Sequence, residues 1–478
     1  METSAEKPAL RSLVSLAWAR CTVALAAEVF GTWLVNARLY PLYNDVLPAA
    51  RDASSLIGVA VLVILAVWAL RRPKDFNEQL LTTASMVGFA LSFGIILLGI
   101  FQQQPLVLLA GSLLRSVSTR WFVVLTGISL CKLSGRSCML CVASALVLSY
   151  ALRIPFGAVD DTVGLIAVAV LPFLAYAACR PLALDMLGVM RASVPPVEAS
   201  VTHPASYLPF AHGLFISIFV FRIAYGFALT FGSVDGNPQQ TFWSVVPLAF
   251  VFAMVFAPRL PKADALYGAA ALFVVAGFLS ATVLSAAGAS IGALANGLLY
   301  AGSECFDALM WFALASIGAR NKANALAVFA WGKASSSAGL LLGATIGHGV
   351  NATPDPFVVA VALAIVLFLF VGVNLTALKN FSFQATIDGV EEPPAVAAAP
   401  ASAGLQEQSA ALAKRCRLTP RETELLELLA HGRNGPFIQE KLVLSRNTVK
   451  THVANIYAKL DVHSQQELID LVQQEPPA

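Results

Sequence analysis

Long apolar segments, separated by short connections, constrain this sequence more than any other feature. Only 12% of the 478 residues are charged and 58% are hydrophobic, which is more apolar surface than a water-soluble core can bury. The segments are long enough, or nearly so, to cross a bilayer, where each must be helical because no water pairs its backbone groups. Twelve such segments cover roughly residues 12–37, 54–70, 79–101, 105–131, 137–152, 163–179, 207–232, 241–257, 263–286, 290–318, 323–347 and 356–378.

The distribution of Lys and Arg over the connections tests the number of predicted spans. If the N-terminus is cytoplasmic, fourteen Lys and Arg fall in inside loops and ends, whereas only Arg38, Arg51 and Arg153 fall outside. Cytoplasmic loops of membrane proteins are enriched in Lys and Arg. The bias therefore predicts an even number of spans in the lipid bilayer, with both termini in the cytoplasm. The first apolar run has no small-residue cleavage site, so we expect a retained helix.

The longest connection, from Arg180 to Ala205, divides the spans into two groups of six. A weak repeat supports this division, because Leu113-Leu114-x-x-x-Ser118 matches Leu298-Leu299-x-x-x-Ser303 at an offset of 185 residues. This organisation of residues 10–380 resembles the major facilitator superfamily of transporters. The loop at residues 71–78 lacks the glycines of that family's signature, which argues against conventional transport.

Charge becomes denser toward the C-terminus. The segment from Lys414 onward holds nine of the 31 Lys and Arg and eight of the 28 Asp and Glu in 65 residues. An Ala/Pro-rich stretch precedes it and predicts a flexible tether with a reach of roughly 30 to 35 Å. We therefore expect an all-α protein with a transmembrane domain at 10–379, a linker at 380–413 and a small domain at 414–474.

Helix signals define the small domain. Thr419 and Glu422 form the ends of a capping box, with Pro420 at the first helical position and Gly432 at the C-terminal left-handed position. A short second helix is expected over 436–442, and Ser445 is the expected cap of a third that runs to Leu460. In that third helix Val449, Val453, Ile456 and Leu460 recur on one face.

The opposite face of the third helix is cationic and polar. No acidic residue occurs between Ser445 and Leu460, so the face can meet phosphates while its short polar side chains reach base edges. A helical adaptor with a merely solvated basic face is the alternative.

The motifs that carry a family resemblance lie in this domain. They are Leu418-Thr419-Pro420-Arg421-Glu422, Leu429-Ala430-x-Gly432, and Ser445-x-x-Thr448-Val449-Lys450-x-His452-Val453-x-Asn455-Ile456-x-x-Lys459-Leu460. They resemble the LuxR-type (NarL/FixJ) helix-turn-helix of bacterial transcription regulators. The resemblance implies a four-helix domain whose third helix enters the major groove of double-stranded DNA, and a homodimer contact through Leu468, Leu471 and Val472 on the fourth helix, residues 465–473.

The resemblance also implies a set of DNA-binding residues. Lys450 and Thr451 would face bases, and Thr419, Ser445, Thr448, His452 and Lys459 would lie near phosphates. The full set is Thr419, Ser445, Arg446, Asn447, Thr448, Lys450, Thr451, His452, Ala454 and Lys459. The sequence departs from the family at Asn434-Gly435-Pro436-Phe437 and at Gln439, where we expect a rebuilt entry to the second helix.

Charged residues also occur inside the expected spans, where they are costly and mark function or pairing. The first and fourth spans pair an acid with bases, and the seventh and tenth pair a base with acids. We hypothesise that they line a pocket for an unidentified small polar or charged ligand; structural ion pairs are the alternative. Lys333 is expected to reach the interface by snorkelling. The candidate ligand-binding residues are Glu28, Arg115, Arg120, Arg222, Glu304 and Asp307.

Together these features predict a regulator in the bacterial cytoplasmic membrane that senses a small molecule or membrane state and binds promoter DNA. A secondary transporter with an appended DNA-binding domain is the second hypothesis. We expect no enzyme, because the sequence has no phosphate loop, nucleophile motif or zinc-ligand spacing. We accordingly expect no catalytic residues, no metal and no cofactor, and interpret the seven cysteines as small apolar residues.

Overall fold

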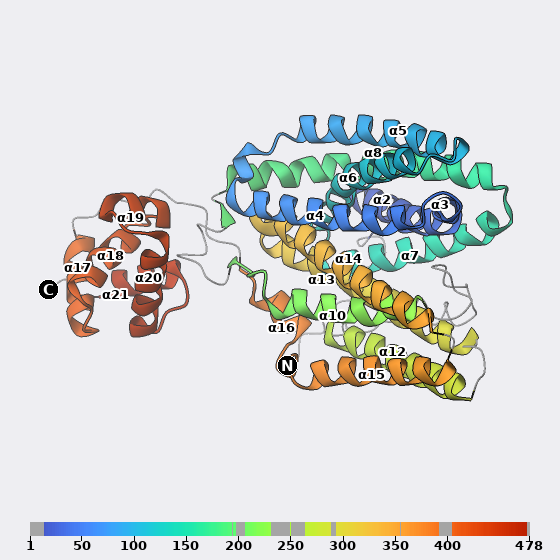
Figure 1. The fold of residues 1–478 in the computed structure, drawn as a ribbon. Coiled ribbons are helices and arrows are strands. Elements are labelled where there is room, and N and C mark those ends of the chain that lie inside the picture. Colours follow the sequence, from blue (N-terminus) through green and yellow to red (C-terminus); the bar gives the residue numbers. More distant parts are fainter. Residues whose placement is uncertain are drawn as a thin grey trace.

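The computed structural model describes residues 14–193, 195–196, 206–230, 249, 263–287, 293–353, 355–391 and 404–475. All regular structure in these residues is helical, which confirms the expected fold class. The helices up to residue 389 pack around one large and one smaller apolar core, and those from residue 404 onward pack around a core of their own. Figure 1 shows the two resulting units, a large helical bundle and a small C-terminal domain.

The first half of the bundle runs from blue to teal in Figure 1. A π-helical turn η1 (Val35–Leu39) and a short α3 (Pro41–Asn44) follow its first long helix, and η2 (Pro73–Asp75) precedes the third. The six long helices are α2 (Leu16–Leu34), α4 (Ala49–Arg71), α5 (Glu78–Phe101), α6 (Pro105–Leu130), α7 (Gly135–Ala158) and α8 (Asp161–Ala192).

The second half contains α10 (Gly213–Ala228), α12 (Ala263–Ala286), α13 (Ala293–Arg320), α14 (Ala325–Asn351) and α15 (Pro356–Leu375), with η5 (Lys322–Asn324) between α13 and α14. Nine helices in the described part of the chain are long and apolar enough to cross a membrane. Every expected span coincides with a helix except the one at 241–257, of which only residue 249 is described.

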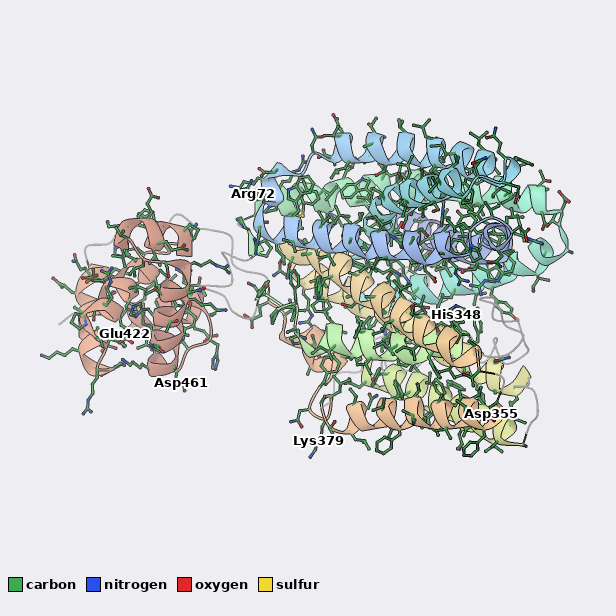
Figure 2. The ribbon with its side chains drawn as sticks, in the orientation of Figure 1. Arg72, His348, Asp355, Lys379, Glu422 and Asp461 are labelled. Carbon is green, nitrogen blue, oxygen red and sulfur yellow. The ribbon has the colours of Figure 1, made fainter. Side chains whose placement is uncertain are left out.

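Helices α13 and α14 are the part of the second half that packs against the first, with α14 along α4 and α13 against α7. Figure 2 shows Arg72 and Lys379 at one end of the bundle, and His348 and Asp355 at the other. This arrangement is the one required if the chain crosses the same layer repeatedly.

A glycine stripe brings α14 and α10 into close contact. Gly339, Gly343 and Gly347 recur every fourth residue on α14, and side chains added at the first two would meet the carbonyl oxygens of Phe219 and Ile223 on α10. In lipid, where apolar burial between helices gains little, such small residues allow the close backbone packing that holds helices together.

The connection between the bundle and the small domain is more structured than the flexible linker expected at 380–413. Helix α16 (Phe383–Gly389) buries Phe383 and Ile387 in the bundle, and Asp264 accepts hydrogen bonds from Ser382 Oγ at 2.6 Å and from the Phe383 amide at 2.7 Å. Helix α17 (Gly404–Arg415) buries Leu405 and Leu412 in the small domain. Neither helix was predicted, because α16 is only seven residues long and α17 directly follows the Ala/Pro/Ser tract at residues 395–403. Each helix is stabilised by the unit on which it docks.

The prediction that Arg153 lies in an outside loop is wrong. Helix α7 continues through Pro155 to Ala158, so Arg153 lies within the helix and is 5% exposed. The sequence placed the end of this span too early because proline usually ends a helix.

The glycine stripe yields a stability prediction. Gly343→Leu should lower the thermal stability of the purified bundle by about 1 to 3 kcal/mol, because the added side chain overpacks the contact with α10. Gly349→Leu is the matched control on the same helix, where an added side chain meets open space. Equal melting temperatures for the two variants would show that the close packing of α10 and α14 does not stabilise the bundle.

Candidate nucleic-acid interface and buried charges of the bundle

The small domain contains a helix-turn-helix built by strong local signals. Its helices after α17 are α18 (Pro420–Ala430), α19 (Gly435–Leu442), α20 (Arg446–Leu460) and α21 (Gln465–Gln474). The capping box between Thr419 and Glu422 is formed, and Gly432 has a φ of 69°, so both predictions are confirmed.

Helix α20 has one buried face and one open face. Val449, Val453, Ile456 and Leu460 are at most 7% exposed, as predicted, and Tyr457 joins them in the core. The ten predicted DNA-binding residues are all accessible, with Thr448 and His452 half-buried and the rest exposed. The structure therefore leaves the predicted set free to meet a partner without unfolding the domain.

Several polar residues of this face are already oriented by hydrogen bonds. Ser445 Oγ caps α20 by accepting from the Thr448 amide at 3.2 Å, and the two hydroxyls lie 2.8 Å apart. Thr451 Oγ1 donates to the Asn447 carbonyl at 3.0 Å. The N-terminal turn of α20 is thus fixed, and the N-terminus of a helix is a favourable position for a phosphate.

Lys459 holds α20 against α18. Its Nζ lies 2.7 Å from Glu422 Oε2, and the same oxygen accepts from the Thr419 amide at 2.8 Å and from Thr419 Oγ1 at 2.9 Å. Burial acts to raise the pKa of Glu422, but the bonds from Lys459 and Thr419 outweigh it and lower the pKa below its ordinary value.

The entry to α19 is rebuilt where the sequence departs from the LuxR pattern. Asn434 caps the helix by accepting from the Phe437 amide at 3.1 Å, Pro436 lies in its first turn, and the Arg433 guanidinium lies 4.9 Å from the Phe437 ring centroid. The cap therefore comes from Asn434 in place of the family's polar start.

The predicted dimer residues of α21 lie mostly in the domain's own core. Leu468 and Val472 are 0% exposed and Leu471 is half-buried. Because they already pack against α18 and α17, a dimer cannot use Leu468 and Val472 without opening the domain. The sequence pattern identified an apolar stripe correctly but could not tell an internal face from an external one.

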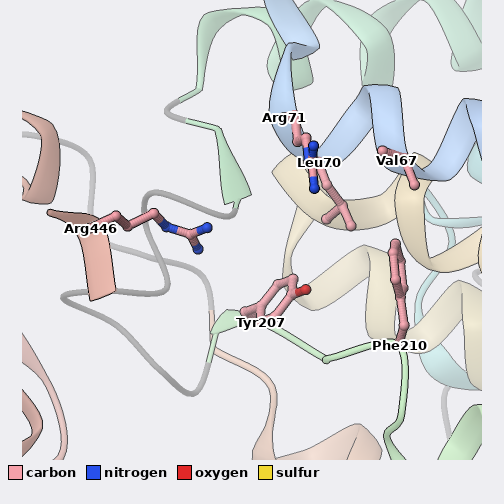
Figure 3. A pocket seen from close by; sticks show the side chains of 6 residues that line it. All are labelled: Val67, Leu70, Arg71, Tyr207, Phe210 and Arg446. Atoms are coloured by element: carbon pink, nitrogen blue, oxygen red, sulfur yellow. The ribbon is translucent and has the colours of Figure 1, made fainter. Parts of the chain in front are cut away.

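A cavity of about 210 Å³ lies where Arg446, at the start of α20, faces the bundle. Figure 3 shows the Arg446 side chain pointing toward the bundle, where Tyr207, Arg71 and Phe210 line the other side of the cavity. Burial raises the pKa of Tyr207, while the positive charges of Arg446 and Arg71 act in the opposite direction. The DNA-facing end of α20 is therefore on the side of the bundle where α4 ends.

Within the bundle, Arg222 and Asp307 form the predicted pair between α10 and α13, and Arg222 also donates to Ser303 at 3.2 Å. Glu304 is bound differently, because its partner is Arg153 of α7 at 3.8 Å, and Arg153 also donates to Tyr300. This contact joins the two halves. Pro155 predicts a helix end close to Arg153, so the sequence did not indicate this contact.

The pairing expected in the first half does not form as a direct ion pair. Among the described residues, Glu28 has no cation within ion-pair distance, and Arg115 donates instead to Tyr40 Oη at 3.1 Å. Lys333 does not snorkel to the interface. It lies 4.5 Å from the Trp311 ring centroid and interacts electrostatically with Asp307 and Glu28.

Acid should destabilise the C-terminal domain through Glu422. Because its folded pKa is lowered, its contribution is complete above the ordinary carboxyl pKa of about 4.3 and is lost as the pH falls through the folded value. At pH 7, Glu422→Gln in residues 404–478 should cost roughly 1 to 2 kcal/mol in urea unfolding, and the difference from wild type should shrink below about pH 4. Glu424→Gln, which breaks a surface pair with Arg421, is the control and should cost under about 0.5 kcal/mol. If the difference in unfolding free energy between Glu422→Gln and wild type did not change with pH, the ionised Glu422 carboxylate would not be the source of the stabilisation.

Val443 should be a strained position in the turn of the helix-turn-helix. Its φ of 53° is left-handed, which β-branched residues rarely adopt, and its side chain is 89% exposed, so little packing offsets the strain. Val443→Asn should stabilise the domain by about 1 kcal/mol in the same unfolding assay. Val443→Ala should gain less, because alanine keeps the Cβ. If Val443→Asn were less stable than wild type, the left-handed backbone at Val443 would not be strained.

Comparisons with known proteins agree with this geometry. Residues 417–472 match the family described as bacterial regulatory proteins, luxR family. The uncharacterized response regulatory protein YgeK of Escherichia coli K12 is 55% identical over 53 residues, which are 11% of this chain and 36% of that protein. The transcriptional regulatory protein LiaR of Bacillus subtilis is 51% identical over 45 residues, 9% of this chain and 21% of that protein. The chain thus spans about a third or less of these curated relatives.

The bundle is similar to solved transporter structures at the level of the fold. The major facilitator proton:xylose symporter XylE is 12% identical with a TM-score of 0.50, over 79% of this chain and 98% of that one. A bacterial homologue of the iron transporter ferroportin is 10% identical with a TM-score of 0.51, over 76% and 99%. The chain therefore joins a helical bundle with the major facilitator fold to a C-terminal domain whose residues 417–472 match the luxR family of bacterial regulatory proteins.

Proposed function

We propose that this protein is a membrane-embedded, one-component transcription regulator of the bacterial cytoplasmic membrane, with both termini in the cytoplasm. The observation that carries the proposal is the open, acid-free face of α20 in a luxR-family domain that shares one chain with a transmembrane bundle. The bundle senses a small molecule or membrane state, and the small domain binds double-stranded promoter DNA. Neither unit is proposed to be an enzyme.

Each residue of the open face has a proposed role. Lys450 and Thr451 contact base edges near the middle of the exposed face, while the capped start of α20 and the hydroxyls of Ser445 and Thr448 contact phosphates. The remaining DNA-binding residues are Thr419, Arg446, Asn447, His452, Ala454 and Lys459. Lys459 would contact phosphate only in addition to its bond with Glu422.

A homodimer on DNA is also proposed, but through surfaces other than the core of α21. The exposed residues of that helix are polar, among them Gln466, Asp470 and Gln473. A polar, weak contact suits a domain that dimerises only when two copies occupy neighbouring half-sites on one duplex.

Arg446 offers a route from bundle to DNA. The same guanidinium lines the cavity beside Tyr207 and belongs to the DNA-facing set, so it cannot occupy both positions at once. A change in the bundle that alters the surroundings of Tyr207 would therefore change the availability of α20.

Transport is the second candidate function, favoured by the near-complete coverage of solved transporters by the bundle. In that case Glu28, Arg115, Arg120, Arg222, Glu304 and Asp307 would bind a substrate that crosses the membrane instead of a signal. Uptake into vesicles containing residues 1–391, which keep α16 on the bundle, would support transport, and ligand binding without flux would support sensing.

DNA binding is tested in two steps. Crosslinking the intact protein to the chromosome should recover promoter fragments, and Lys450→Ala should weaken binding to a recovered duplex by about 10- to 100-fold in fluorescence anisotropy. Lys414→Ala removes the same charge from exposed α17 and should change affinity less than about twofold. If both variants weaken binding equally, the positive charge of the domain, and not the face of α20, accounts for the affinity.

A further inference from the structure

The interior of the bundle holds more positive than negative charge. Among the described residues, five cations and three carboxylates lie at least five residues inside the ends of their helices and are at least partly buried. They are Glu28, Arg115, Arg120, Arg153, Arg222, Glu304, Asp307 and Lys333. A surplus of two positive charges at bilayer depth is costly unless something compensates it.

The pairing pattern locates this surplus in the first half. Arg222 is bound to Asp307, and Arg153 is bound to Glu304. Glu28 is the one carboxylate of the set left for three cations, of which Lys333 lies over an aromatic ring and interacts with Asp307 as well. Arg115 and Arg120 on α6 therefore lack carboxylate partners of their own.

Two arginines contact the side chain of Tyr40. Arg115 is 8% exposed, donates to Tyr40 Oη at 3.1 Å and has its Cζ 5.7 Å from the ring centroid, while Arg51 of α4 lies 5.1 Å from the same centroid. Tyr40 directly follows the π-helical turn η1. Such turns are rare and are frequently found at functional sites.

The arginines retain unused donors. The Nε atoms of Arg115 and Arg120 are buried and have no hydrogen-bond partner among the described residues. Gly58 of α4 makes room for Arg120, because a Cβ at Gly58 would lie 2.5 Å from Arg120 Nε and 2.6 Å from its Nη2. Arg120 therefore fills the space beside Gly58 and is held against α4. Guanidinium groups with unpaired N–H donors suit the binding of a planar oxyanion.

We propose that Arg115 and Arg120, with Tyr40 and Arg51, bind the carboxylate of a small organic anion, which is the signal read by the bundle. The proposal deepens the sensing role and rests on it. A lipid headgroup is a poorer occupant, because Arg115 lies ten residues, or about 15 Å, inside the start of α6 and faces Tyr40. Glu304 and Asp307 would keep the second half electrically balanced, so the anion compensates the first half alone.

The test measures thermal unfolding of the full chain in detergent with matched probes at equal ionic strength. Acetate and benzoate should raise the melting temperature by roughly 2 to 4 °C near saturation, whereas the neutral acetamide and benzamide should not. Arg120→Gln should abolish this difference without lowering the melting temperature of the ligand-free protein, because it removes an uncompensated charge. Arg38→Gln, which breaks the 2.5 Å pair with Asp161, is the control and should lower stability while keeping the carboxylate response.

Three results would overturn the proposal. Equal shifts with carboxylates and amides would exclude a carboxylate site, and a loss of stability in ligand-free Arg120→Gln as large as in Arg38→Gln would make Arg120 a structural residue. A lipid headgroup is tested by comparing nanodiscs of phosphatidylcholine with and without phosphatidylglycerol. If phosphatidylglycerol stabilises the wild type and Arg120→Gln removes this stabilisation, the site binds a headgroup. No DNA is present, so these failures are independent of the promoter-binding test.

Discussion

Backbone hydrogen bonding in the absence of water is the constraint on which the bundle depends. A peptide group in hydrocarbon must find its partner within the chain, so every span is a helix and the charged residues inside it must be satisfied by one another or by a ligand. The glycine stripe on α14 follows from the same condition, because close backbone packing replaces the apolar burial that holds soluble helices together. Charged side chains inside such a bundle are therefore few, and each one without an oppositely charged partner indicates either a bound ligand or a structural cost.

The C-terminal domain obeys the opposite rule. Its core is small, and its stability comes from apolar residues of α18, α20 and α21 together with caps that satisfy the helix ends. Glu422 contributes to both the capping and the packing of the domain, since one carboxylate oxygen accepts from the Thr419 amide at the start of α18 and binds Lys459 of α20. A polar group thus fixes the angle at which α20 is presented, while the apolar face fixes which side is open.

Patterns that repeat over many residues could be predicted from the sequence, and single positions at the ends of elements could not. The spans and the core face of α20 follow from hydropathy and helical period, which sum over long windows. The predicted position of Arg153 was wrong because Pro155 predicted a helix end, although α7 continues past it, and α17 was not predicted because it directly follows the Ala/Pro/Ser tract at residues 395–403. The Glu304–Arg153 pair was beyond reach, because it joins residues far apart in sequence across the two halves, and no local pattern encodes such a contact.

Helix α16 docks on the bundle through Asp264 and through the ion pair of Arg320 with Asp388, so the chain departs from the membrane protein at a fixed point. Between Glu391 and Gly404 the chain can span at most on the order of 40 Å. In the proposed function, this tether would confine the DNA-binding domain to a thin layer of cytoplasm next to the membrane. Expression of a target gene would then depend on how close the gene comes to the membrane, a distance set by the docking of one short helix.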